Sequence, residues 1–436
     1  MKTDTPQTIY LKDYRQPDYH ISKTHLTFHL GDNETLVEGR FEVVQTENGE
    51  AGAPLLLDGA ELELRSVKVD GQDVDKSRLT FGHETLSIAD VPATFILETQ
   101  VAIDPENNTS LEGLYRSSTM FCTQCEAQGF RKITYYIDRP DNLATFTTVI
   151  IADGTTFPIA LSNGNLVSEE KLDNGLVKTT WEDPYPKPSY LFALVAGDLE
   201  YIEDRYVTTS GRDVTLRIYV EEQNITKCDH AMLALKQSME WDEQRFNLEY
   251  DLDIYMIVAV NDFNFGAMEN KGLNIFNSKY VLARIDTATD SDFEGIQGVV
   301  GHEYFHNWSG NRVTCRDWFQ LSLKEGLTVF RDQEFSADLN SRSIKRIDDV
   351  NQLRTFQFPE DAGPMSHPIR PASYIEINNF YTVTIYEKGA EVIRMLHTIL
   401  GEEGFQKGVA LYFQRHDGQA VTTDDWLSAM EDANDV

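Results

Sequence analysis

The chain has 436 residues, more than one hydrophobic core usually serves, so at least two domains are expected. Its composition, 41% hydrophobic and 25% charged, is that of a globular protein, and no apolar run approaches the roughly 20 residues of a membrane helix. Acidic residues outnumber basic ones by 71 to 38, and the formal charge of −33 disfavours nucleic acid and anionic lipid as partners.

The N-terminus and the cysteines indicate the compartment. Residues 1–19 are polar and lack the apolar stretch of a signal peptide, which predicts a cytoplasmic protein. The four cysteines are too sparse for a disulfide scaffold. Cys122 and Cys125 have redox or zinc-knuckle spacing, but no second pair or nearby histidine pair completes a site. We therefore expect reduced thiols that bind no metal.

The first part of the chain is predicted to be mostly β. Apolar and charged residues alternate over residues 37–43 and 61–65, and Asp70-Gly71 is a tight-turn signal. Residues 145–151 and 190–196 are rich in β-branched or aromatic side chains, and the prolines before the second run exclude helix there. Gly197-Asp198 is a reasonable boundary, which predicts an N-terminal β domain over residues 1–198.

The remainder, residues 199–436, mixes the two periodicities. Residues 214–220 alternate as a strand, 232–239 have helical spacing, and 254–260 form the continuous apolar run of a buried strand. Helical signals dominate from about residue 292. The sequence thus predicts a second domain of α+β type.

A motif with metal-ligand spacing lies in this second part. His302 and His306 are four residues apart, so on a helix they lie on one face about one turn apart and can bind the same ion. Glu303 stands beside them to act on a water molecule. By itself an HExxH motif also arises by chance in long chains.

A third candidate ligand strengthens the interpretation. Glu325 follows His306 after eighteen intervening residues, on a segment that reads as a second helix, and residues 309–311 break the first helix so that the second can return beside it. Two histidines, one glutamate and an open fourth position are typical of catalytic zinc, with one ion per chain. Asp332 lies on the same helix face as Glu325 and could orient a ligand histidine, or be an ordinary surface carboxylate.

Several motifs in a fixed order resemble one family. Gly266-Ala267-Met268-Glu269-Asn270, then HExxH, then Glu325 is similar to the aminopeptidase N family of gluzincin metallopeptidases, in its bacterial branch. The resemblance implies an all-β, saddle-like N-terminal domain followed by an α+β, thermolysin-like catalytic domain. Full-length members continue into a small β domain and a large helical one, whereas this chain ends at Val436. We expect those further domains to complete the enclosure of the active site. Residues 423–430 read as the start of a capped helix with an apolar face, which we expect to be exposed where the further domains are absent.

The resemblance also implies roles for individual residues. Glu269 and Glu126 accept hydrogen bonds from the protonated amine of a peptide, which makes the enzyme release single N-terminal residues. Glu303 is the general base and Tyr386 stabilises the oxyanion, although the residues alone do not choose Tyr386 over Tyr381. The motif residues Gly266, Ala267, Met268 and Asn270 are assigned to further substrate contacts. Three more residues are candidates for the pocket that holds the side chain of the released residue, and ordinary packing is an equal alternative for them: Gln124, Phe265 and Tyr381.

Three other functions are weighed against this one. A thermolysin-type endopeptidase would not need Glu126 and the segment around Glu269. An epoxide hydrolase of the leukotriene-processing kind tends to have glycine where this chain has Ala267. A catalytically dead scaffold would not need Glu303 and Tyr386. The sequence therefore favours a zinc aminopeptidase of the alanyl aminopeptidase type, acting on peptides with a free N-terminal amine.

Overall fold

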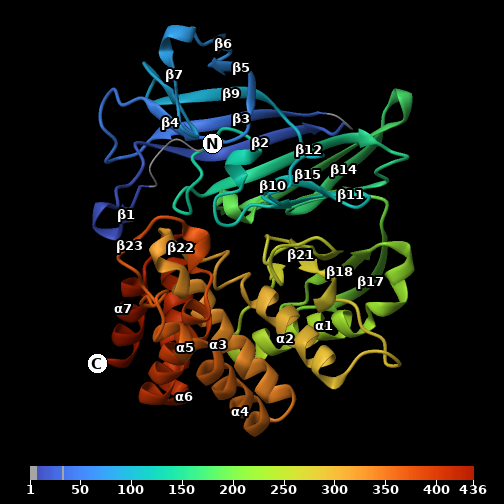
Figure 1. The fold of residues 1–436 in the computed structure, drawn as a ribbon, viewed down its shortest axis with the longest axis vertical. Helices are drawn as coiled ribbons and strands as arrows, with labels where there is room; N and C mark the ends of the chain where they lie inside the picture. Colours follow the sequence, from blue (N-terminus) through green and yellow to red (C-terminus); the bar gives the residue numbers. More distant parts are fainter. Residues whose placement is uncertain (1–6, 32–33) are drawn as a thin grey trace. The chain divides into compact units, whose positions relative to one another are not determined.

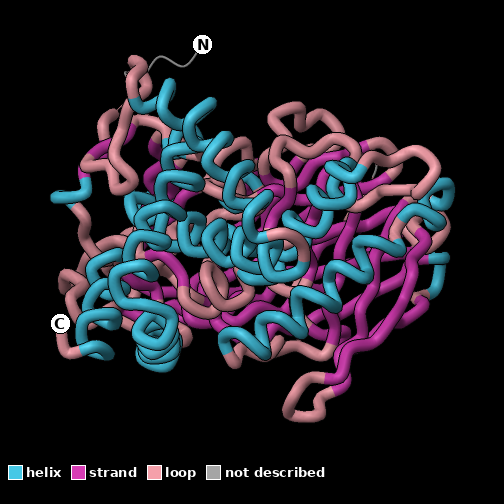
Figure 2. The backbone as a smooth tube through the Cα atoms, turned by 90° about the horizontal axis from the view of Figure 1, so that it is seen from below, coloured by secondary structure: helices cyan, strands magenta, loops and turns pink. Residues whose placement is uncertain are grey.

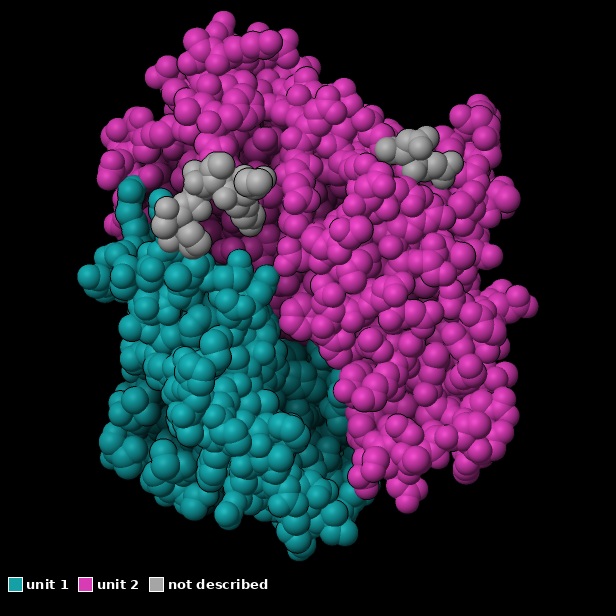
Figure 3. All heavy atoms as spheres, in the orientation of Figure 1, with its two compact units in different colours: residues 1–15, 237–248, 297–436 teal, residues 16–236, 249–296 magenta. Residues whose placement is uncertain are grey.

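The computed structural model describes residues 7–31 and 34–436, which form two compact units (Figure 3). The sheet unit comprises the described residues within 16–236 and 249–296, and the helical unit comprises those within 1–15, 237–248 and 297–436. The domain boundary expected after Asp198 stays a prediction.

The main feature of the sheet unit is an eight-stranded sheet with the order β14-β15-β12-β2-β3-β9-β5-β6 (Figure 1). Its neighbours pair antiparallel except β12 and β2, which are parallel. Figure 2 shows long strands running side by side. The strands are β2 (Tyr19–His29), β3 (Thr35–Gln45), β5 (Glu63–Val69), β6 (Gln72–Asp73), β9 (Thr94–Ile103), β12 (Ala144–Asp153), β14 (Asn165–Lys171) and β15 (Leu176–Lys187).

The alternation seen in the sequence determines which face of this sheet is buried. In β3, Val37 and Phe41 are fully buried while Glu38 and Arg40 are exposed, as period-two alternation predicts. Asp70-Gly71 joins β5 to β6, and both residues have a positive φ, at 50° and 74°. Two positive φ values are what a tight hairpin of this kind requires, so the predicted turn is confirmed.

Three further sheets belong to the same unit. The first two have the orders β10-β11-β16-β13 and β4-β8-β7. Their strands are β10 (Gly113–Ser117), β11 (Met120–Gln124), β16 (Leu194–Gly197), β13 (Ile159–Ser162), β4 (Leu55–Asp58), β8 (Thr85–Ile88) and β7 (Leu79–Gly82). The strand expected over residues 190–196 is shorter than predicted, because a 3-10 turn occupies Ser189–Leu191 after Pro188.

The third of these sheets carries the segment around Glu269. Its order is β17-β18-β19-β21-β20, with β17 (Glu200–Val207), β18 (Asp213–Val220), β19 (Ile254–Val260), β21 (Leu273–Asn277) and β20 (Ala267–Met268). The predicted strands over residues 214–220 and 254–260 are confirmed as β18 and β19. β20 is the edge strand, so Ala267 and Met268 pair with β21 on one side only.

The helical unit is built around α3 (Leu321–Leu339), which is buried along most of its length. The other helices are α1 (Asp229–Phe246) and α2 (Asp290–Phe305), which contribute residues to both units, and α4 (Arg342–Gln352), α5 (Phe358–Asp361), α6 (Gly389–His416) and α7 (Thr423–Asn434). Two short strand pairs complete the unit: β1 (Ile9–Tyr10) with β23 (Ser373–Tyr374), and β22 (Thr314–Cys315) with β24 (Ala420–Val421).

The apolar surface of the helical unit differs from expectation. Residues 423–430 were expected to expose an apolar face, but Trp426 and Met430 of α7 are buried, and the indole of Trp426 packs edge-on against Tyr412 of α6 at 4.9 Å. Exposed apolar side chains lie instead on the first half of α6 and on α4, namely Val392, Met395, Ile399, Ile344 and Ile347. The α7 face has its partner within this chain.

Two general expectations concern membranes and thiols. Among the described residues, no helix is long and apolar enough to cross a membrane. All four cysteines are buried free thiols. Burial raises the pKa of Cys122 to about 12, so this thiol stays protonated and unreactive at neutral pH. The cytoplasmic location itself stays a prediction.

Candidate metal centre

Three side chains of the helical unit converge on one point. His302 lies in the last turn of α2, His306 follows the end of that helix, and Glu325 lies on α3. The two Nε2 atoms are 3.0 Å apart, and Oε2 of Glu325 is 3.4 Å from Nε2 of His302 and 3.3 Å from Nε2 of His306. All three residues are buried or nearly so, which makes them a candidate ligand set.

The hydrogen bonds behind the two imidazoles determine what faces this point. Nδ1 of His306 is 2.8 Å from the carbonyl oxygen of Ser309, which can only accept, so Nδ1 carries the proton and donates it. Nδ1 of His302 donates in the same way to Oδ2 of Asp332 at 2.7 Å, the orienting contact that the sequence allowed for Asp332. In the neutral rings, both Nε2 lone pairs are therefore directed at a shared site that also holds a carboxylate oxygen, and such a set attracts a cation.

The spacing of the three atoms fits zinc. Bonds of about 2.0–2.2 Å in a tetrahedron place neighbouring ligand atoms about 3.3–3.5 Å apart. The two distances from Glu325 lie within this range, and the histidine pair is slightly closer. Oε2 of Glu325 is also a buried atom without a hydrogen-bond partner among the described residues. The donor set of two imidazoles and one carboxylate suits a catalytic zinc ion.

Residues of α3 hold the turn that carries His306. The Thr328 hydroxyl donates to the carbonyl oxygen of Ser309 at 3.1 Å. The fully buried guanidinium of Arg331 donates to the carbonyl oxygen of Phe305 at 2.8 Å and forms an ion pair with Asp242 of α1. These contacts join the turn after α2 to α3 and α1, and they fix His306 relative to Glu325.

A close contact between two glycines determines where Tyr386 lies. A Cβ atom added to Gly326 would come within 2.8 Å of the carbonyl carbon of Gly389, so α3 and the start of α6 can only meet this closely through glycine. Tyr386 lies on the π-helical turn Thr384–Lys388 directly before α6, and its ring stacks near His302 with a centroid distance of 6.4 Å. Glu303, next to His302 on α2, is buried.

The carboxyl group of Glu387, beside Tyr386, has an unusual pKa. Burial and the nearby carboxylates of Asp332 and Asp349 together raise that pKa to about 7, against the opposing charge of Lys345. The ordinary value is near 4.3, so the folded chain binds this proton more tightly than the unfolded chain does. The resulting stabilisation is complete below about pH 4 and is lost as the pH rises through about 7.

We therefore expect Glu387→Gln to stabilise the metal-free protein at alkaline pH. The amide mimics the neutral acid, so the free energy of unfolding should rise by about 1–3 kcal/mol at pH 8 and change little near pH 5. Urea unfolding of the chelator-treated protein at the two pH values measures the difference. An equal effect at both pH values would contradict the titration of Glu387.

A second group of predicted residues lies in the sheet unit. Glu126 follows β11 and Glu269 follows β20, and both are buried. A carboxylate oxygen of each lies within 4.8 Å of the other. Nearby, Nε2 of Gln124 donates to the carbonyl oxygen of Glu126 at 3.2 Å and contacts the Met268 sulfur at 3.5 Å. Two carboxylates buried at this spacing repel each other unless a cation lies between them, so the site favours a cationic ligand.

The remaining predicted residues are distributed over both units. Gly266 and Ala267 lie at the edge of the five-stranded sheet, where the backbone of Ala267 pairs with β21. Asn270 is fully buried and follows Glu269 directly, and Phe265 is partly buried in the loop before β20. Tyr381 belongs to the helical unit, where it follows the 3-10 turn Ile377–Phe380.

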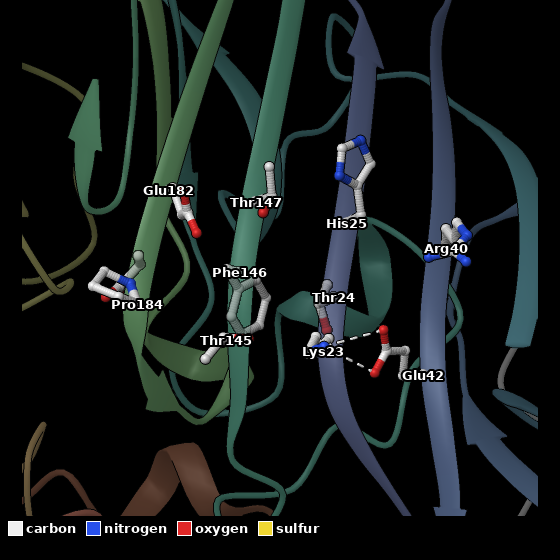
Figure 4. A pocket seen from close by; sticks show the side chains of 11 residues that line it. Lys23, Thr24, His25, Arg40, Glu42, Thr145, Phe146, Thr147, Glu182 and Pro184 are labelled. Atoms are coloured by element: carbon white, nitrogen blue, oxygen red, sulfur yellow. Dashed lines mark hydrogen bonds and ion pairs between the residues drawn. The ribbon is translucent and has the colours of Figure 1, made fainter. Parts of the chain in front are cut away.

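A separate pocket of about 430 Å³ lies on the eight-stranded sheet (Figure 4). It is lined by polar side chains of β2, β3, β12 and β15, among them Lys23, His25 and Arg40. Lys23 is paired there with Glu42 of the neighbouring strand. None of the predicted site residues lines this pocket, and its charges are mixed, so it carries no functional assignment.

Sequence reasoning missed some residues of the metal centre. Thr328 and Arg331 act on the turn after α2, a long-range contact without a sequence signature. Lys324 had a usable signal, since it is the only charged residue before Glu325 in a segment that is otherwise apolar or small, Leu321-Ser322-Leu323. A charge within a segment that must be buried needs a partner, and here that partner is Glu325.

Comparison with known proteins relates this geometry to a family. Residues 230–436 match the peptidase family M1 domain and residues 16–191 match the peptidase M1 N-terminal domain. The chain is 59% identical to aminopeptidase N of Escherichia coli (strain K12) over 434 residues, covering 100% of this chain and 49% of that protein. For aminopeptidase N of Haemophilus influenzae the identity is 57%, with 98% of this chain and 49% of the relative covered.

A solved structure agrees with these matches. It is the crystal structure of Legionella pneumophila aminopeptidase A in complex with aspartic acid, which is 36% identical and superposes with a TM-score of 0.93 over 98% of this chain and 49% of that one. The chain thus spans about half the length of the relatives it matches. The expected all-β domain followed by an α+β catalytic domain is confirmed. The two domain matches cover most of the sequence, and the chain belongs to peptidase family M1.

Proposed function

We propose that this chain carries the catalytic apparatus of a zinc-dependent aminopeptidase, which hydrolyses the first peptide bond of peptides with a free N-terminal amine. The observation that carries the proposal is the convergence of three ligand atoms of His302, His306 and Glu325 within 3.4 Å of one another in an M1 chain. A zinc ion bound by these residues would polarise the scissile carbonyl and lower the pKa of an attacking water molecule.

The protein's own groups supply the proton transfers. Glu303 is buried beside the ligand set, and we assign to it the role of taking a proton from the attacking water and delivering it to the leaving amine. The phenol of Tyr386 donates a hydrogen bond to the oxyanion that forms at the carbonyl. Its ring lies beside that of His302, which supports this role over one for Tyr381.

The specificity for an N-terminal residue rests on the carboxylates of the sheet unit. We assign Glu126 and Glu269 to the α-ammonium group, because two buried carboxylates within 4.8 Å match a single cation that can donate three hydrogen bonds. The edge position of β20 favours backbone hydrogen bonds from Gly266 and Ala267 to the peptide, as in an added strand. Met268, Asn270, Gln124, Phe265 and Tyr381 are the proposed remaining substrate contacts.

The direct test uses an aminoacyl anilide and its N-acetyl derivative. We expect the chain to hydrolyse the free-amine substrate, to lose this activity with a chelator, to regain it with Zn²⁺, and to leave the acetylated substrate intact. Plasma emission spectrometry should find one zinc per chain. Cleavage that persists after metal removal would contradict the proposal, and equal cleavage of both substrates would indicate an endopeptidase.

The M1 relatives contain about as much sequence again beyond the matched half, and we propose that this segment of a relative packs on the helical unit. The exposed apolar side chains of α4 and α6 are the candidate surface. The two helices are linked by the ion pair of Arg346 with Glu391, and exposed apolar surface of this kind usually marks an interface. Adding the C-terminal half of the Escherichia coli relative, in cis or in trans, should raise both the melting temperature and peptide turnover. A monodisperse chain that gains neither property would contradict this packing.

A further inference from the structure

One carboxylate of the metal centre divides its two oxygens between different partners. Oε2 of Glu325 lies 3.3–3.4 Å from the two histidine Nε2 atoms. Oε1 accepts a short hydrogen bond of 2.6 Å from Nζ of Lys324, the preceding residue on α3. The ammonium and the carboxylate are only 1% and 3% exposed, so water does little to weaken this contact.

Burying a charged side chain at the position of Lys324 is energetically costly. Leu321, Leu323 and Leu327 on the same helix are buried, and an ammonium group in such surroundings is retained only when it is paired. The turn after α2 lies close by, since a Cβ added to Gly310 would be in ordinary van der Waals contact with Cβ of Lys324, at 3.6 Å. A helix that only had to present Glu325 could carry an apolar residue here.

We propose that Lys324 is a positioning residue that keeps Glu325 a one-oxygen zinc ligand and lowers its negative charge. This inference rests on the metal site of the proposed function. By holding Oε1, the ammonium prevents the carboxylate from binding through both oxygens, so the fourth position stays open to substrate. The ammonium also offsets the negative charge of the carboxylate. A bound ion would therefore be held less tightly and would be a stronger electrophile.

The first measurement is the zinc dissociation constant, determined by competition with a chromogenic chelator on the 436-residue chain. Because a buried cation near a divalent ion repels it strongly, we expect Lys324→Met to bind zinc about 10- to 100-fold more tightly than the wild type. Lys324→Gln keeps a hydrogen-bond donor without the charge and should also bind more tightly. Lys324→Arg keeps both features and should stay close to the wild type.

The second measurement is the d–d absorption of the Co²⁺-substituted protein, which weakens when a four-coordinate ion becomes five-coordinate. Lys324→Met frees Oε1 and should weaken the absorption, whereas Lys324→Gln still holds that oxygen and should not. Asp332→Asn is the matched control in the opposite direction, because loss of the partner of His302 should weaken zinc binding by about 10- to 100-fold.

The outcomes separate this inference from the proposed function. The role of Lys324 would be overturned if Lys324→Met and Lys324→Gln both bound zinc no more tightly than the wild type. This conclusion requires that the metal-free variants melt at the same temperature as the metal-free wild type. If Lys324→Met does not fold, the comparison of Lys324→Gln with Lys324→Arg decides, since equal affinities would overturn it. If the wild type binds no zinc, or if its zinc binding persists in His306→Ala, the metal site itself is wrong, and the proposed function with it.

Discussion

Replacing Glu303 with glutamine should reduce hydrolysis of an aminoacyl anilide by about 10²–10⁴-fold while one zinc ion per chain is retained. The amide keeps the size of the side chain but cannot accept the proton of an attacking water. Zinc should remain because its three proposed ligands are His302, His306 and Glu325, whose converging atoms are untouched. The measurements are steady-state kinetics and metal content.

Glu294 offers a matched control for this substitution, because it lies on the same helix α2 and is exposed. Glu294→Gln should leave both rate and zinc content unchanged. Loss of stoichiometric zinc in Glu303→Gln would show that Glu303 is a ligand, and retention of most activity would show that another group is the base.

Removing one carboxylate from the pair in the sheet unit should impair recognition of the N-terminal amine. Glu269→Gln keeps the side-chain size and loses the charge that we assign to the α-ammonium. A charge-assisted hydrogen bond contributes about 1.5–3 kcal/mol, so kcat/KM should fall by about 10- to 150-fold. Zinc content should not change, because Glu269 does not belong to the proposed ligand set.

The companion substitution and a change in the substrate sharpen this test. Glu126→Gln should have an effect of the same size, since the two carboxylates lie within 4.8 Å of each other. Acetylating the substrate amine should abolish cleavage by the wild type and by both variants. Cleavage of the acetylated substrate by the wild type, or an unchanged kcat/KM for the free amine in both variants, would contradict the assignment.

The fold could be read from the sequence where one residue pattern dictates one structure. The alternation of apolar and polar residues predicted β3 and β18, and Asp70-Gly71 predicted a tight turn with two positive φ angles. Both patterns depend only on residues that are neighbours in the sequence. The strand predicted over residues 190–196 was too long. The whole segment is buried, so the residues of the 3-10 turn are as apolar as those of the strand and the sequence does not separate the two. Likewise, the apolar face around Trp426 does not indicate its partner, which is α6.

The candidate metal centre could be predicted in part for the same reason. Helical periodicity places His302 and His306 one turn apart whatever surrounds them. The place of Glu325 depends on how α3 returns beside α2. The helix break at residues 309–311 and the eighteen-residue spacing predicted that return, and the resemblance to a family supported it. Contacts such as that of Arg331 with Asp242 join residues of α1 and α3, and no local pattern encodes them.

The contact of Gly326 with Gly389 has a consequence for engineering this protein. Glu325 precedes one glycine and Tyr386 lies three residues before the other, so their separation is set by two main chains in van der Waals contact rather than by side chains. Side-chain substitutions elsewhere in the helical unit cannot bring Glu325 and Tyr386 closer together. Replacing either glycine with a larger residue would push the two main chains apart. Substitutions that change the proposed substrate contacts should therefore leave both glycines unchanged.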